Sequence, residues 1–88
     1  MIIKKGFAKR EIAGSYIVVP VGSKSMDFNG MITLNESGSF FWDCFKNDIT
    51  IDEAVGLVTK EYEIDAETAR DDIIKFVEIL RENDLIDE

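Results

Sequence analysis

The sequence predicts an α+β domain in which three short strands precede three helices. Its 88 residues suit one small domain, and 45% of them are apolar, which allows a core. Segments rich in β-branched and aromatic residues lie before residue 35, whereas three apolar patterns with helical spacing follow it. The connections are short, so successive elements are expected to pack side by side. We therefore expect residues 1–88 to form a single domain.

The predicted strands form a hairpin and a third, shorter strand. Phe7 to Ile12 and Ser15 to Pro20 flank Ala13-Gly14, a dipeptide suited to a tight hairpin turn. The second of these strands is rich in β-branched and aromatic residues, and it ends on a proline, which cannot donate to a ladder of hydrogen bonds. A connection that contains glycine and asparagine leads to a third strand from Met31 to Leu34. Together these segments predict one small antiparallel sheet.

Each predicted helix has a recognisable start. Asn35 and Ser37 are alternative caps for the first helix, because either side chain can accept a hydrogen bond from a free backbone N–H. Thr50 and Glu53 have the spacing of a capping box, which predicts the start of the second helix. Asp65 is a suitable cap for the third helix.

Apolar residues recur at helical spacing after each start. The second and third helices, joined by Glu63-Ile64, are typical of a helix-turn-helix, and a small sheet beside them gives a winged-helix-like arrangement. The first helix is expected to end before Asn47-Asp48, and the third near Asn83. The predicted core stripes are Phe41, Cys44 and Phe45; Ile51, Ala54, Val55, Val58 and Tyr62; and Ala66, Ala69, Ile73, Phe76, Val77 and Leu80.

Three consecutive aromatic residues in the first helix cannot all face one narrow stripe. Phe41 lies at the centre of the stripe, with Phe40 and Trp42 on opposite sides of it. Two interpretations remain open. Either the helix buries a wide face between the sheet and the other helices, or one flanking aromatic lines a groove for a partner.

Composition excludes several classes of function. The chain has no His and a single Cys, which argues against Cys–His and Ser–His–Asp catalysis and against a zinc site. We predict no enzymatic activity, no cofactor and no metal, and we expect Cys44 to be a buried apolar residue without a disulfide partner. No apolar run has the roughly 20 residues of a membrane helix. A signal peptide is also not evident, so a cytoplasmic protein is expected.

The charge distribution argues against a nucleic-acid partner. The formal net charge is −8, and 16 of the 18 acidic residues follow residue 34. Affinity for nucleic acids depends on Lys and Arg neutralising phosphates, so this balance favours partners that are basic or basic in patches.

Two features together predict a groove for a peptide. The third strand, Met31-Ile32-Thr33-Leu34, has no Lys or Pro that would block its edge, so an extended peptide could pair with it. The predicted third helix carries an apolar strip beside its core stripe, bracketed by cations that could receive acidic side chains of a peptide. The alternative is that the isoleucine of this strip is packed and its arginines pair with nearby carboxylates. The strip consists of Arg70, Ile74, Val77 and Arg81.

An ordered series of motifs extends over nearly the whole chain. The most specific segment is Asn29 to Gly38, followed by Trp42. The series also includes Arg10-Glu11, Tyr16 to Pro20, Glu61-Tyr62 and Ile79 to Ile86. This series resembles the PqqD-like family of RiPP recognition elements, which bind the leader peptide of a ribosomally made precursor.

The resemblance implies a winged helix-turn-helix-like fold with a three-stranded antiparallel sheet followed by three helices. It also implies a leader peptide that joins the third strand in a cleft against the third helix. The partners would be that peptide and a tailoring enzyme, often a radical SAM protein, which would supply the bond chemistry. The peptide-binding residues would be Met31, Ile32, Thr33, Leu34, Arg70, Ile73, Ile74, Val77 and Arg81.

Two other functions are compatible with the predicted fold. One is a winged-helix regulator or nucleic-acid binder, which the acidic balance opposes. The other is a non-catalytic subunit that forms a homodimer through its open strand edge, which would occupy the same edge that a peptide needs.

Overall fold

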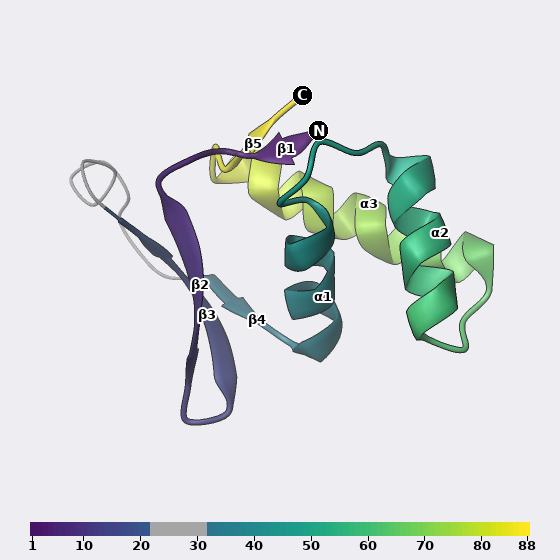
Figure 1. Ribbon diagram of the computed structural model, residues 1–88, viewed down its shortest axis with the longest axis horizontal. Coiled ribbons are helices and arrows are strands. Elements are labelled where there is room, and N and C mark those ends of the chain that lie inside the picture. Colours follow the sequence, from purple (N-terminus) through teal and green to yellow (C-terminus); the bar gives the residue numbers. More distant parts are fainter. Residues whose placement is uncertain (22–31) are drawn as a thin grey trace.

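A three-stranded antiparallel sheet precedes three helices, which confirms the predicted α+β fold (Figure 1). The computed structural model describes residues 1–21 and 32–88. No helix in these ranges is long and apolar enough to cross a membrane. The elements are β1 (Ile2–Ile3), β2 (Phe7–Ile12), β3 (Ser15–Pro20), β4 (Ile32–Leu34), α1 (Glu36–Cys44), α2 (Ile51–Glu61), α3 (Ala66–Glu82) and β5 (Ile86–Asp87).

The β2–β3 hairpin has the predicted bounds and turn. Ala13 and Gly14 have φ angles of 53° and 81°, the left-handed values that a two-residue hairpin turn of the primed type requires. β3 is the central strand, with β2 on one side and β4 on the other. Thr33 of β4 lies opposite Ile17 of β3, and Leu34 lies opposite Tyr16. Within the described residues, the predicted third strand is therefore an edge strand. Its first predicted residue, Met31, lies outside these residues.

The predicted helix caps are present. Asn35, rather than Ser37, caps α1, and its side chain accepts a hydrogen bond from the backbone N–H of Gly38 at 2.7 Å. α2 begins with the predicted capping box, in which Thr50 and Glu53 exchange two hydrogen bonds of 3.0 Å. Asp65 caps α3.

β1 and β5 form a second, two-stranded sheet that the sequence analysis did not predict. Ile3 pairs with Ile86, so the two ends of the chain lie side by side (Figure 1). After α3, Asp84 adopts a left-handed φ of 58°, which turns the chain back toward β1. Two-residue strands are too short to show an alternating pattern in a sequence, which explains the omission.

α1 lies between the sheet and α2, and it buries a wide aromatic face (Figure 1). Trp42 and Phe45 are almost completely buried. Phe76 of α3 packs against the Phe41 and Phe45 rings, with centroid distances of 5.6 and 6.5 Å. Phe40 is half-buried and packs edge-on against Tyr62. The wide buried face proposed from the sequence is thus the arrangement found.

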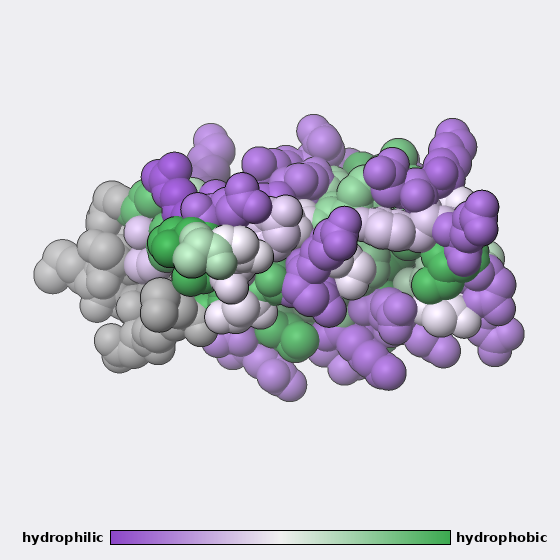
Figure 2. Space-filling model, turned by 90° about the horizontal axis from the view of Figure 1, so that it is seen from below, coloured by the Kyte–Doolittle hydropathy of each residue, from purple (hydrophilic) through white to green (hydrophobic). Residues whose placement is uncertain are grey.

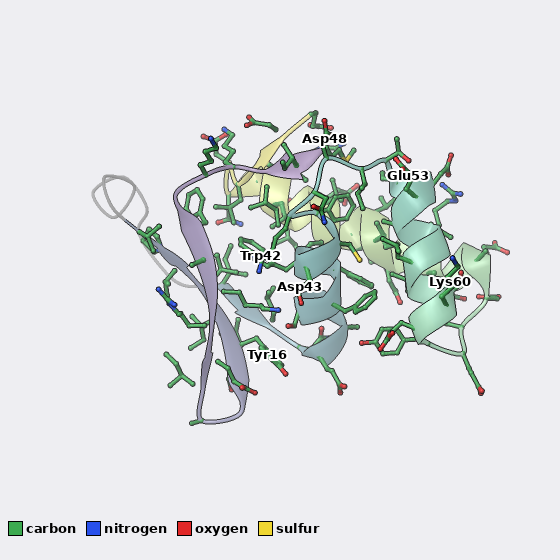
Figure 3. The ribbon with its side chains drawn as sticks, in the orientation of Figure 1. Tyr16, Trp42, Asp43, Asp48, Glu53 and Lys60 are labelled. Atoms are coloured by element: carbon green, nitrogen blue, oxygen red, sulfur yellow. The ribbon has the colours of Figure 1, made fainter. Side chains whose placement is uncertain are left out.

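A lysine connects the sheet to α1. The Lys9 ammonium reaches from β2 to the Ser39 hydroxyl at 2.7 Å and to the Asp43 carboxylate at 2.8 Å. The same ammonium lies 5.5 Å from the centre of the Tyr16 ring. Figure 3 shows Asp43 on α1 and Tyr16 on the sheet at this junction. These contacts hold the sheet against α1 and so help to fix the position of β4, which precedes α1 directly.

Candidate functional site

A cleft of about 570 Å³ lies between the β4–α1 segment and α3. One wall comes from the end of β4 and the first turns of α1, and the other wall comes from one side of α3. The cleft is open to solvent, and it adjoins the edge strand of the three-stranded sheet. Its lining residues are Thr33, Leu34, Asn35, Ser37, Gly38 and Phe41, together with Asp72, Lys75, Phe76 and Ile79.

The first wall offers backbone groups for hydrogen bonding. In the described part of the sheet, β4 has a neighbouring strand on one side only, which is β3. Backbone groups on the other side of an edge strand are unpaired and can bind an added strand. Thr33 is exposed and Leu34 is buried, so the two residues face opposite sides of the sheet, as the alternation of a strand requires.

The apolar base of the cleft is formed by Leu34, Phe41 and Phe76, which are all buried core residues. Because these residues belong to the packed core, the base is rigid and preformed. Gly38 lines the cleft at the start of α1. A Cβ atom at this position would lie 3.0 Å from the Asn35 side-chain oxygen and 3.5 Å from the Leu34 Cβ. Only glycine therefore fits beside the α1 cap without a shift of its neighbours.

The second wall is one side of α3. Lys75 and Phe76 lie three and four residues after Asp72, and Ile79 lies four and three residues after them. Ile79 is the exposed apolar group of this wall, with 45% of its surface accessible. Lys75 and Asp72 are exposed and place one charge of each sign at the rim. The cleft therefore combines an apolar base, a half-exposed isoleucine and two ionised side chains.

The residues predicted on the third strand lie at this cleft or beside it. Thr33 and Leu34 line it, whereas Ile32 is half-buried against the core. Met31, which was also predicted, lies outside the described residues. Whether these residues contact a peptide stays a prediction.

The residues predicted on the third helix do not line the cleft. Ile73 and Val77 are completely buried in the core. Arg70 pairs with Asp52 of α2, with 2.6 Å between the guanidinium nitrogen and the carboxylate oxygen. Arg81 forms two hydrogen bonds with Glu88, which lower the pKa of the Glu88 carboxyl group. The arginines thus have the carboxylate partners that the alternative interpretation of the strip assigned to them.

The cleft lies on the other side of α3 from this strip. With about 100° between successive residues, Ile74 lies about 100° around the helix from Lys75 and about 140° from Ile79. Sequence reasoning overlooked Asp72, Lys75 and Ile79. The available signal was Ile79, an apolar residue outside the predicted core stripe, but the position of β4 beside it is set by tertiary packing.

Charged side chains surround the cleft without forming a candidate metal centre. Figure 2 shows polar and charged groups over much of the face seen from below, with apolar groups exposed between them. Among residues 1–21 and 32–88, no group of three or more acidic or cysteine side chains is placed to hold a metal ion. Burial raises the pKa of the Cys44 thiol, and the neighbouring Asp43 carboxylate adds to this effect, so the thiol is not activated as a nucleophile.

Comparison with known proteins identifies the family. A family model described as coenzyme PQQ synthesis protein D (PqqD) matches residues 16–86. The chain belongs to the PqqD family. The family resemblance inferred from the sequence motifs is therefore confirmed. Comparison with curated proteins gives no match.

A solved structure has the same fold as this PqqD-family chain. It is described as "TbiB1 in Complex with the TbiA(beta) Leader Peptide", and it superimposes with a TM-score of 0.75. The match covers 97% of this chain and 93% of the TbiB1 chain, with 20% sequence identity. The likeness therefore extends over nearly the whole of both chains and supports the fold assignment.

Proposed function

We propose that residues 1–88 form one peptide-binding domain that binds the leader of a ribosomally synthesised precursor and presents it to a tailoring enzyme. The observation that carries this proposal is the cleft between the open edge of β4 and α3. Membership of the PqqD family and the fold shared with TbiB1, a protein solved with a leader peptide, support it.

The leader would bind as a fourth strand beside β4. Backbone hydrogen bonds to an edge strand supply affinity for an extended peptide whatever its sequence, and pockets for alternate side chains supply specificity. Here the pocket would be the apolar base of Leu34, Phe41 and Phe76, with Ile79 above it. An apolar side chain of the leader would leave water there, which contributes about 1.5–3 kcal/mol for a large aliphatic or aromatic group.

The domain would contribute binding and orientation, and the bond chemistry would belong to the enzyme. Holding a leader close to an enzyme raises the effective concentration of the attached core peptide. We propose a radical SAM protein as the enzyme class, on the basis of the family resemblance. This role needs no cofactor in the chain, and the described residues contain no candidate metal site.

A nucleic-acid-binding role receives less support from the same surfaces. The outward side of α3 carries Glu67, Asp71, Glu78 and Glu82, which are all exposed. A recognition helix in a DNA groove would bring these carboxylates toward phosphates, where like charges repel.

A scan of N-methylated peptides tests strand addition. The probe is a synthetic leader from a precursor-like reading frame encoded beside this chain, methylated at one backbone nitrogen at a time and titrated calorimetrically. An added strand points alternate N–H groups toward its neighbour. We therefore expect affinity to fall at every second position, by about tenfold or more where a hydrogen bond is lost and a methyl group clashes.

Two results would contradict the proposal. Failure of the unmodified leader to bind would remove the adaptor role, and equal effects at all positions would remove the strand-addition geometry. Light scattering at each titration point distinguishes a one-to-one complex from pairing of two β4 edges in a homodimer, which would compete with the peptide.

A further inference from the structure

Among the described residues, one cation lines the cleft, and it is Lys75. Lys75 lies in the middle of α3, and it forms no ion pair with the carboxylates of residues 1–21 and 32–88. Several other cations of the described residues form ion pairs. Arg70 and Arg81 pair with Asp52 and Glu88, and Lys9 pairs with Asp43. Lys75 is the cleft-lining residue with a positive side chain.

Two further features bear on the charge of the cleft. The first turn of α1 lines the same space through Asn35, Ser37 and Gly38, and the amino end of a helix favours a negative group nearby. Asp72 lies one turn before Lys75 on the same wall. Its carboxylate disfavours a second negative group in the cleft. It also competes for the Lys75 ammonium, although the two side chains form no ion pair. The polarity of the site therefore depends on the balance between Asp72 and Lys75.

We propose that Lys75 selects leader segments that carry an acidic side chain close to the large apolar side chain seated over Phe41 and Phe76. This inference rests on the proposed function and names the chemistry of the peptide that the cleft accepts. The acidic group would give Lys75 the carboxylate partner that it lacks within the described chain. The apolar group would occupy the base in van der Waals contact with core atoms, at the separation of about 3.5–4.5 Å that is usual for packed side chains.

The positions of Lys75 and Ile79 on α3 determine which side chains of a leader strand can contact both residues. These residues are four apart on α3, so their side chains lie on the same side of the helix. On an extended peptide, residues two apart point to the same face. A leader strand can therefore direct one apolar and one acidic side chain toward this wall, which sets both its register and its composition.

A display experiment tests this inference with a random library of peptides of about a dozen residues, selected on the immobilised full-length chain. The variants are Lys75→Glu and, as a matched charge change outside the cleft, Lys60→Glu. Lys60 is exposed, lies on α2 and forms no ion pair with the described residues (Figure 3).

We expect the unmodified chain and Lys60→Glu to enrich the same acidic and apolar pattern, whereas Lys75→Glu should lose the acidic preference. In calorimetric titrations, replacing the acidic side chain of the best peptide by its amide should lower affinity by about fivefold, typical of a partly exposed charge pair. Asp72→Asn should raise the affinity of the acidic peptide, and added salt should reduce the difference between acid and amide.

The outcomes separate this inference from the proposed function. If the unmodified chain enriches peptides that share an apolar anchor without an acidic preference, or if Lys75→Glu retains that preference, the assignment to Lys75 is wrong and peptide binding stands. If the unmodified chain enriches no peptide family, or if enriched peptides bind Ile79→Asp normally, binding at this cleft is itself refuted.

Discussion

The two sides of α3 that flank its buried stripe are similar in composition and different in environment. One side carries Ile74 with Arg70 and Arg81, and the other carries Ile79 with Lys75. Each side therefore combines an isoleucine with one or two cations on an otherwise acidic helix. On the first side, both arginines pair with carboxylates of neighbouring segments. On the second side, the isoleucine and the lysine line the cleft beside β4.

This comparison shows that a binding surface depends on what lies opposite a helix as much as on its side chains. The first side is closed by contacts with α2 and the C-terminal segment, whereas the second faces an open strand edge. An apolar residue beside a strand edge can contribute to peptide binding, because the backbone of the strand supplies the hydrogen bonds that an extended partner needs. Substitutions confined to one side of α3 can therefore distinguish the two surfaces.

The largest expected difference is between Ile79→Asp and Ile74→Asp. Ile79→Asp places a carboxylate in the cleft and should lower leader affinity by at least about tenfold, since an apolar contact worth roughly 1.5–3 kcal/mol is lost. Ile74→Asp should leave affinity within about twofold and instead lower stability, because Ile74 is half-buried away from the cleft. Titration calorimetry and chemical unfolding measure the two effects separately.

Leu57→Asp is the control for a new exposed carboxylate. Leu57 lies on α2 outside the cleft lining, and it is 44% exposed, against 45% for Ile79. Equal loss of leader affinity in the Leu57 and Ile79 variants would show that net charge, rather than the cleft contact, determines binding.

A smaller effect is expected when the two arginine pairs are removed. Arg70→Ala and Arg81→Ala each delete an exposed ion pair, so the free energy of unfolding should fall only slightly. Leader affinity should not change, because neither guanidinium lines the cleft. Loss of affinity in both variants, with stability retained, would move the binding surface to the side of α3 first predicted from the sequence.

The smallest expected effect is a loss of folding stability at acid pH, which does not distinguish the two sides of α3. Hydrogen bonds from Thr68 hold the pKa of the Asp65 carboxyl group below its usual range. The folded-state pKa is lowered, so this stabilisation is complete above the unfolded-state pKa and is lost as pH falls through the folded-state value. Below about pH 4, stability should therefore decline.

Asp65→Asn should keep the cap and remove this part of the pH dependence, because asparagine is an equally good N-cap residue that does not titrate. Thermal unfolding from neutral to acid pH measures the difference. A variant with the same acid sensitivity as the unmodified chain would show that other carboxyl groups dominate the decline.

Local sequence signals were sufficient to predict most of the fold. The hairpin around Ala13-Gly14, the capping box of Thr50 and Glu53, and the Asp65 cap depend on residues close in sequence, and all are present. The β1–β5 sheet joins the two ends of the chain through strands of two residues. Such short, distant pairing leaves no periodic pattern, so it could not be predicted in this way.

Only part of the candidate site could be predicted from the sequence, because the rest depends on how segments far apart in the chain pack together. The open strand was visible in the sequence, because a short strand next to a helix cap has local signals. The side of α3 that faces this strand could not be identified from the sequence, because an isoleucine and at least one cation lie on each side of the core stripe. The choice between them depends on how α1 and the Lys9 contacts place β4 against the helices, which is a property of tertiary packing.

Methyl NMR of the isoleucine side chains tests the central claim most directly, because Ile79 and Ile74 report on opposite sides of one helix. The chain would be labelled at the isoleucine δ1 methyl groups and titrated with the synthetic leader. We predict saturable shifts for Ile79 and for Ile32 beside the cleft, with Ile74 nearly unchanged. Saturable shifts of Ile74 with Ile79 unchanged would contradict the proposed cleft, even if the leader binds.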